Sequence, residues 1–305
     1  MKIAVPDLIS PSYFPAEAAV VLGLFANEGI DAELELIAPV ERAYAALKDG
    51  AVDIVAGSAH STLSAFPRWK GAKLLCAQSQ GLYWFLVMRS DLKGRKGDLS
   101  VVKGCRIGAA PWVGMALRRL LVESGINLER DGVSIVPVPG SVGTNVNIGV
   151  VAANALRDRT IDGFWANGMG AEIAISTGVG TLIVDARRGD GPVGAFNYTM
   201  ATIATTDDFI NENPANAAGT VRAIVGAQKA LKENVDVAAV VGEKLFAGEA
   251  EHIVTLVRRD LPFYQAHLSR DFVAGMNQFS RNLGILDEEV SYDSVVATQF
   301  KDLWN

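Results

Sequence analysis

The chain has 305 residues, of which 50% are hydrophobic and 20% are charged, and its formal net charge at pH 7 is −6. This length suggests two units of ordinary domain size. The acidic balance, without any Lys/Arg run longer than two residues, argues against a nucleic-acid-binding protein.

The sequence contains no apolar run long enough to span a membrane. Its start, MKIAVPDL, is typical of a strand and lacks the regions of a signal peptide. We therefore expect either a cytoplasmic protein that starts at Met1 or a periplasmic protein whose signal peptide has been removed.

The two cysteines, Cys76 and Cys105, both lie in apolar stretches. They form neither a zinc-ligand pattern nor a disulfide framework, so we expect buried thiols, with one disulfide as the alternative. No metal-ligand motif, phosphate loop or dinucleotide fingerprint occurs, and we expect neither a metal nor a cofactor.

The first ninety residues alternate strand-like and helix-like segments. Apolar runs and apolar–polar alternation predict strands, and apolar residues at helical spacing predict helices. We expect strands over 2–5, 32–37, 52–57, 73–78 and 84–89, and helices over 15–28, 41–48 and 61–66. This order is typical of a largely parallel sheet with helices on both faces.

Residues 90–104 are polar and rich in glycine, and we interpret them as a crossing into a second lobe with the same pattern. We expect strands over 105–110, 134–138, 161–166 and 181–185, helices over 114–124, 145–158 and 170–177, a strand over 198–206 returning to the first lobe, and helices beyond 207, the longest over 214–233 and another over 249–257. The prediction is an α/β protein with lobe I formed by 1–89 plus 200–305 and lobe II by 90–199. Two such crossings make a hinge that can close around a ligand.

Six stretches carry a resemblance to a known family. They are GLFANEGIDAEL (23–34), ALKDGAVDIVAGSAHS (46–61), LKG (92–94), VKGCRIGAAPWVGMALRRLLVESGI (102–126), ALRDRTIDGFWANGMGAEIAISTGVGTLIVD (155–185) and FINENPANAAGTVRAIVGAQKALKENVDVAAVV (209–241). Together they resemble the nitrate/sulfonate/taurine group of periplasmic-type solute-binding proteins of ABC transporters, which includes binders of thiamine-pyrimidine precursors. The resemblance implies a two-lobed, type II periplasmic-binding-protein-like fold with mixed, mainly parallel sheets.

Ligands of such sheets bind outside the carboxyl ends of the strands, so the loops after strands are candidate sites. We expect the first loop to contribute Ser10, Ser12, Tyr13 and Phe14, and the second to contribute Ser58, His60 and Ser61. The alternatives are a helix-capping role for Ser12 and a structural hydrogen bond for His60.

Aromatic residues mark the other candidate loops. We expect ligand contacts from Tyr83, Trp84, Trp112, Val113, Trp165, Asn167 and Asn197, although Tyr83 and Trp84 suit a buried core equally well. The family resemblance implies a helix start that offers N–H groups to an anion, but Pro111, Trp112 and Val113 replace the usual small polar residues there. This departure favours a flatter, more apolar ligand.

These features predict a monomeric solute-binding protein that captures a small aromatic or heterocyclic molecule, with a carboxylate as one option, and delivers it to the membrane permease of an ABC transporter. The alternative is a cytoplasmic enzyme on the same scaffold, a decarboxylase, hydrolase or desulfinase-like protein using His60. Sulfinate-cleaving members of that group use a cysteine in the first loop, where this chain has Ser10 and Ser12.

Overall fold

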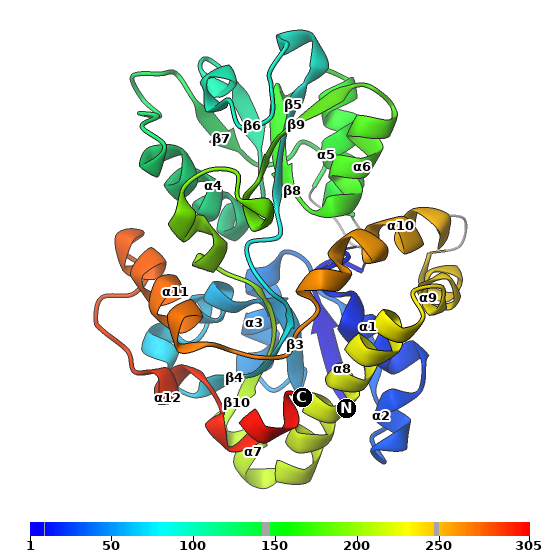
Figure 1. The fold of residues 1–305 in the computed structure, drawn as a ribbon. Helices are drawn as coiled ribbons and strands as arrows, with labels where there is room; N and C mark the ends of the chain where they lie inside the picture. Colours follow the sequence, from blue (N-terminus) through cyan, green and yellow to red (C-terminus); the bar gives the residue numbers. More distant parts are fainter. Residues whose placement is uncertain (9, 142–146, 247–249) are drawn as a thin grey trace. The chain divides into compact units, whose positions relative to one another are not determined.

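The computed structural model describes residues 1–8, 10–141, 147–246 and 250–305 (Figure 1). The helices expected over 145–158 and 249–257 begin at residues outside this described part. Contacts divide the chain into a first unit, Met1–Gly81 with Thr199–Asn305, and a second unit, Leu82–Tyr198. Each unit contains a mixed five-stranded sheet flanked by helices.

The sheet of the first unit has the strand order β2-β1-β3-β10-β4. Its strands are β1 (Lys2–Val5), β2 (Glu33–Leu36), β3 (Ile54–Ser58), β4 (Ala72–Ser79) and β10 (Ala201–Thr206). β1 pairs in parallel with β2 and β3, whereas β10 runs antiparallel between β3 and β4. The strand predicted to return from the second lobe is therefore a central strand of this sheet.

Helices surround this sheet. They are α1 (Phe14–Val21), α2 (Leu24–Asn27), α3 (Val40–Lys48), α7 (Asp207–Glu212), α8 (Pro214–Glu233), α9 (Val237–Leu245), α10 (Ala250–Asp260), α11 (Arg270–Asn282) and α12 (Tyr292–Val295), with short 3-10 helices at Ala59–Ser64, Pro67–Trp69, Leu261–Phe263 and Thr298–Leu303. The helix predicted over 214–233 is confirmed as α8. The single helix predicted over 15–28 is divided, because Gly23 adopts a left-handed conformation with φ 75° between α1 and α2.

The sheet of the second unit has the strand order β7-β6-β8-β5-β9. Its strands are β5 (Phe85–Arg89), β6 (Arg106–Gly108), β7 (Ser134–Val136), β8 (Gly163–Ala166) and β9 (Gly180–Asp185). The helices are α4 (Pro111–Glu123), α5 (Ile148–Arg157) and α6 (Gly168–Ser176), with short 3-10 helices at Ser90–Leu92, Leu99–Val102, Ala186–Arg188 and Val193–Asn197. Side chains from β5, β8, α5 and α6 form one apolar core in this unit.

The expected boundary at residue 89 differs from the structure. β5 pairs antiparallel with β8 and β9, so Phe85–Arg89 belongs to the second unit, and the divisions fall at Gly81/Leu82 and Tyr198/Thr199. An apolar run such as WFLVMR could form a buried strand in either sheet. Which sheet it joins is determined by pairing with strands more than seventy residues away.

Candidate ligand-binding site

Four strands of the first unit meet at one edge of its sheet, where β1, β3 and β4 end and β10 begins. Ala201, the first residue of β10, pairs with Ser58 at the end of β3 and with Ser79 at the end of β4. Ser10 follows β1, and Thr199 precedes β10. We call this the first-unit edge. Ser58 and Ser79 end β3 and β4, Thr199 comes just before β10 and Ser10 lies in the loop after β1, and all four hydroxyl side chains are buried.

The first predicted loop lies at this edge and is more buried than a solvated loop. Ser10, Ser12, Tyr13 and Phe14 all have at most 4% exposure. The Tyr13 N–H donates to the Ser10 carbonyl at 3.0 Å. The residue at the N-cap of α1 is Tyr13, without a side-chain cap, so the capping role considered for Ser12 is not observed.

The second predicted loop follows β3 as a 3-10 helix over Ala59–Ser64, where the sequence indicated a helix over 61–66. The hydroxyl oxygens of Ser58 and Ser61 lie 2.7 Å apart. His60 is fully buried, and its ring meets Phe279 edge-on at 5.5 Å. Its backbone N–H donates to the Thr199 hydroxyl at 3.4 Å, which ties this loop to the start of β10.

Two residues of the first-unit edge, Ser79 and Thr199, were missed from the sequence. The strand-end rule applied to KLLCAQSQG would have found Ser79, whereas Thr199 precedes its strand and requires the direction of β10. The hydroxyl oxygens of Ser10 and Ser79 are buried and have no hydrogen-bond partner among the described residues. Buried hydroxyls usually have partners, so these two are exceptions that call for an explanation.

The corresponding edge of the second unit is aromatic. Phe85 begins β5 and pairs with Ala166 at the end of β8 and with Asp185 at the end of β9, which defines the second-unit edge. The Tyr83 and Trp84 ring centroids are 4.8 Å apart, and those of Trp84 and Trp165 are 6.4 Å apart.

The three rings therefore form one cluster, and all three are buried. The indole N–H of Trp165 is also buried and has no hydrogen-bond partner among the described residues.

Charged groups lie beside this aromatic cluster. Arg187 is only 4% exposed, and its guanidinium lies 5.8 Å from the Tyr83 ring centroid. One oxygen of Asp185 accepts from Arg188 at 2.8 Å, and the other is buried and has no hydrogen-bond partner in the described part of the chain.

Helix starts supply the remaining predicted residues. Asn167 caps α6, its side-chain oxygen accepting from the Gly170 N–H at 3.1 Å, and is 6% exposed. Pro111 occupies the first turn of α4, where its missing N–H costs nothing, and Trp112 and Val113 follow it, half-buried. Asn197 is half-buried at the end of a 3-10 helix.

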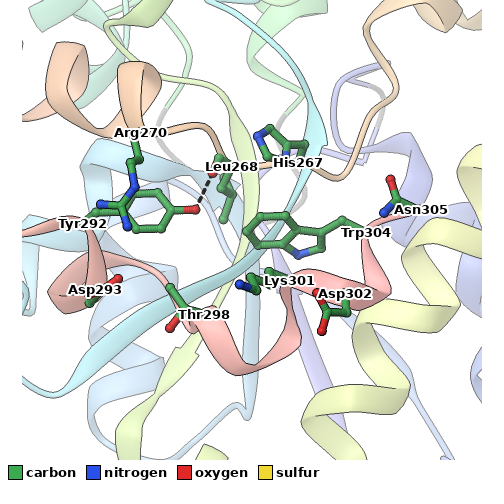
Figure 2. Close-up of a pocket in the computed structure, with 10 residues that line it drawn as sticks. All are labelled: His267, Leu268, Arg270, Tyr292, Asp293, Thr298, Lys301, Asp302, Trp304 and Asn305. Carbon is green, nitrogen blue, oxygen red and sulfur yellow. Dashed lines mark hydrogen bonds between the residues drawn. The ribbon is translucent and has the colours of Figure 1, made fainter.

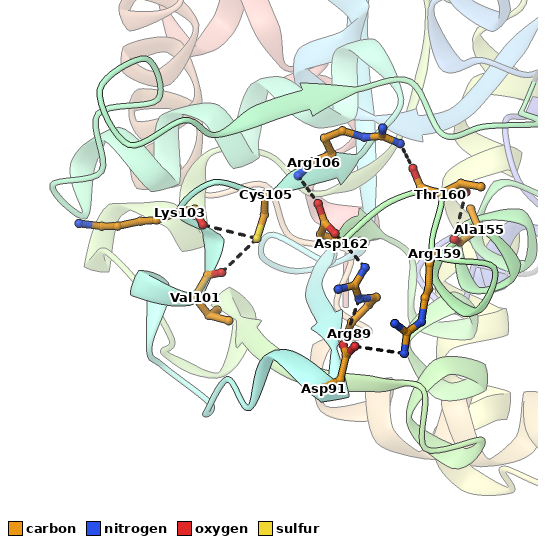
Figure 3. Close-up of polar contacts among 10 residues, drawn as sticks. All are labelled: Arg89, Asp91, Val101, Lys103, Cys105, Arg106, Ala155, Arg159, Thr160 and Asp162. Atoms are coloured by element: carbon orange, nitrogen blue, oxygen red, sulfur yellow. Dashed lines mark hydrogen bonds and ion pairs between the residues drawn. The ribbon is translucent and has the colours of Figure 1, made fainter.

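A separate polar cluster lies at the other end of the second-unit strands, away from the second-unit edge (Figure 3). Arg89 at the end of β5 contacts Asp91 and Asp162, each at 3.0 Å. The Cys105 thiol donates to the Val101 carbonyl at 3.4 Å. None of the predicted site residues lies in this cluster. Its contacts join the end of β5 to the starts of β6 and β8 and have a structural role.

Both cysteines are free thiols, which resolves the alternative of a disulfide. Burial raises the pKa of each, with the charge of Asp162 adding to the effect at Cys105. Neither has the lowered pKa of a nucleophilic cysteine.

A cavity of about 680 Å³ lies between the segment 267–270 and the C-terminal residues of the first unit (Figure 2). Its polar groups largely engage one another: the Tyr292 hydroxyl donates to the Leu268 carbonyl at 2.5 Å, and the Arg270 guanidinium lies 4.5 Å from the Tyr292 ring centroid. The rings of His267 and Trp304 meet edge-on at 5.2 Å. This cavity contains none of the predicted site residues.

In the part of the chain that the structure describes, no group of three or more His, Cys, Asp or Glu side chains is placed to hold a metal ion. Within the same residues, no helix has both the length and the apolar character needed to cross a membrane.

No protein-family model matches the sequence, and no curated protein matches it either. Solved structures do match. A protein from Bordetella bronchiseptica RB50 has a TM-score of 0.78 at 20% identity, covering 99% of this chain and 95% of that one. The alkanesulfonate-binding protein SsuA from Xanthomonas axonopodis pv. citri, bound to MOPS, has a TM-score of 0.70 at 13% identity, covering 97% of both chains. The desulfurization enzyme DSZB has a TM-score of 0.68 at 15% identity, covering 99% and 97%.

The chain therefore has the two-unit α/β fold of the ABC solute-binding proteins, as sulfonate- and nitrate-binding neighbours also show. The resemblance predicted from the sequence is confirmed at the level of the fold. Because an enzyme shares the same fold, the function has to be argued from the site residues.

Proposed function

We propose that this protein is a solute-binding protein that captures a small aromatic or heterocyclic molecule and delivers it to the permease of an ABC transporter. The observation that carries the proposal is the first-unit edge, where the ends of β3 and β4, the start of β10 and the loop after β1 each contribute a buried hydroxyl. Two of these, on Ser10 and Ser79, have no partner among the described residues. Such groups are costly unless a ligand completes their hydrogen bonds.

The aromatic cluster supports the ligand class. Tyr83, Trp84 and Trp165 supply flat apolar surface, and the Trp165 indole supplies a hydrogen-bond donor. Binding pockets commonly combine apolar walls with a few placed polar groups.

The charge distribution favours a carboxylate on that ligand. Residues 82–198 contain 13 Lys and Arg against 10 Asp and Glu, whereas the whole chain contains 28 against 34. The second unit is thus basic within an acidic protein, and Arg187 is buried beside the aromatic cluster. A basic surface raises the local concentration of anionic ligands.

The test is a thermal-shift screen of aromatic carboxylates, aromatic sulfonates and pyrimidines, followed by calorimetry on the hits. A ligand at a hundred times its Kd stabilises the native state by about 2.7 kcal/mol. Ser79→Ala and Trp165→Phe are expected to weaken binding of the hit, and Ser176→Ala, on the exposed end of α6, is the control. A screen without any stabilising compound, or a hit bound equally well by both variants, would count against the proposal.

The second candidate is an enzyme, favoured by the full burial of His60 at the first-unit edge and by the likeness to a desulfurization enzyme. His60→Ala separates the candidates, with the exposed His252→Ala as control. A solute-binding protein returns its ligand chemically unchanged and loses only affinity. An enzyme that uses His60 as acid or base converts the compound and loses roughly 10²–10⁴-fold in rate.

A further inference from the structure

Glu17 is a buried carboxyl group that the site described above does not use. It lies in the first turn of α1 with 0% exposure, and both of its carboxylate oxygens are buried without a hydrogen-bond partner among the described residues. An ionised carboxylate in such surroundings loses its hydration without compensation, so the protonated form is favoured.

The charged groups around α1 do not offset this cost. Burial raises the pKa of Glu17 well above its usual value of 4.5, and the nearby charge of Asp7 raises it further. The helices packed on α1 carry exposed charged groups, namely Arg222, Lys229, Lys232, Glu233, Glu243 and Lys244; β2 carries Glu33 and Glu35, and β4 carries Lys73. None of these groups contributes to the pKa shift of Glu17.

The first turn of α1 is fastened to the sheet, and this connects Glu17 to the first predicted loop. The Ala16 N–H donates to the Gln78 side-chain oxygen at 3.3 Å, and the Gln78 amide donates to the Thr202 carbonyl at 3.1 Å. Tyr13, which ends the loop, is one helical turn before Glu17. While this turn keeps its place, Glu17 is fully buried, so a charged Glu17 can be hydrated only if its surroundings open.

We propose that Glu17 is a proton-binding site, and that its bound proton keeps residues 10–14 in their buried position at the first-unit edge. Loss of the proton places an uncompensated charge inside the protein and favours release of the loop. An effect of this proton on ligand affinity rests on the proposed function, in which residues 10–14 contact the ligand. Its effect on the position of these residues does not depend on the proposed function.

The first test measures stability in the absence of any ligand. Because the native pKa of Glu17 lies above its unfolded value, the proton's contribution to stability is fully present below about pH 4.5 and is lost as the pH rises through the native pKa. Urea unfolding from pH 4 to 9 is therefore expected to show wild type losing stability relative to Glu17→Gln as the pH rises. Glu233→Gln, at the exposed end of α8, is the matched control and should follow wild type.

The second test measures the loop. Hydrogen–deuterium exchange of peptides covering 10–21 is compared between wild type and Glu17→Gln at each pH, so that the intrinsic pH dependence cancels. Between about pH 4.5 and the native pKa, exchange in wild type relative to that of the variant is expected to rise by up to about tenfold per pH unit, and the ratio levels off above the native pKa. Peptides covering β8 and α6 should not differ between the two proteins.

Glu17→Leu, which also lacks a charge, should behave like Glu17→Gln and covers the case in which the amide itself perturbs the fold. A constant stability difference between wild type and both variants from pH 4 to 9 would overturn the proposal, as would equal loop exchange. Either result is independent of whether a ligand is found, so a failure here is distinct from a failure of the proposed function.

Discussion

Gly149→Ala tests how the second unit positions Asn167. Gly149 lies in the first turn of α5, and a Cβ added there would meet the Asn167 side-chain oxygen at 2.3 Å. That oxygen accepts the Gly170 N–H that begins α6, so the amide has to leave its capping position. Overpacking costs about 1–3 kcal/mol and loss of a cap costs ~1 kcal/mol, while alanine returns up to ~1 kcal/mol of helix propensity. We expect a net loss of about 2 kcal/mol.

The assay is urea unfolding, together with affinity for the hit from the ligand screen. Gly226→Ala in α8 is the matched control, because its Cβ would meet only Leu24, at an ordinary 3.5 Å. This variant should gain ~0.5–1 kcal/mol. If Gly149→Ala unfolds at the same urea concentration as wild type, the close approach of α5 to α6 does not constrain Asn167, and its assignment to the site loses its structural support.

Three further predictions concern buried groups of the first unit and the two thiols. Gln78→Leu removes the side-chain partners of the Ala16 N–H and the Thr202 carbonyl. It should lower the free energy of unfolding by about 2–5 kcal/mol, measured in urea. Tyr264→Phe removes the hydroxyl that donates to the Pro11 carbonyl at 2.5 Å, and we expect a loss of ~1 kcal/mol by the same measurement. Cys76 and Cys105, buried and with raised pKa values, should react with a thiol reagent at pH 8 much more slowly in the native protein than in urea, whereas fast native labelling would contradict their burial.

The sequence was informative where local pattern determines structure. The strand at 52–57 and the hydroxyls that follow it were predicted from an apolar run and the strand-end rule, and Ser58, His60 and Ser61 lie buried at that strand end. The long α8 was predicted from its initial proline and its alanine-rich body. These features depend on residues only a few positions apart.

Other features depend on pairing between distant segments, and there the sequence was insufficient. Phe85–Arg89 was predicted in the first lobe, but its partners are β8 and β9. The buried Arg187 lies beside the ring of Tyr83, more than a hundred residues earlier in the chain. A run of apolar letters and a loop with two arginines carry no information about which distant segment covers them.

The direction of the antiparallel strand β10 explains why Thr199 was missed, whereas Tyr83 and Trp84, in the equivalent place before β5, were predicted from their aromatic rings. In a parallel sheet the residues after each strand reach the ligand edge, and the sequence search followed that rule. β10 and β5 run against their neighbours, so at the same edges the residues before them take this place: Thr199 before β10, and Tyr83 and Trp84 before β5. In both units the antiparallel strand is also the one that the chain enters directly after passing from the other unit. The segments that connect the units therefore supply residues to both edges, and a search for ligand contacts in this fold has to include them.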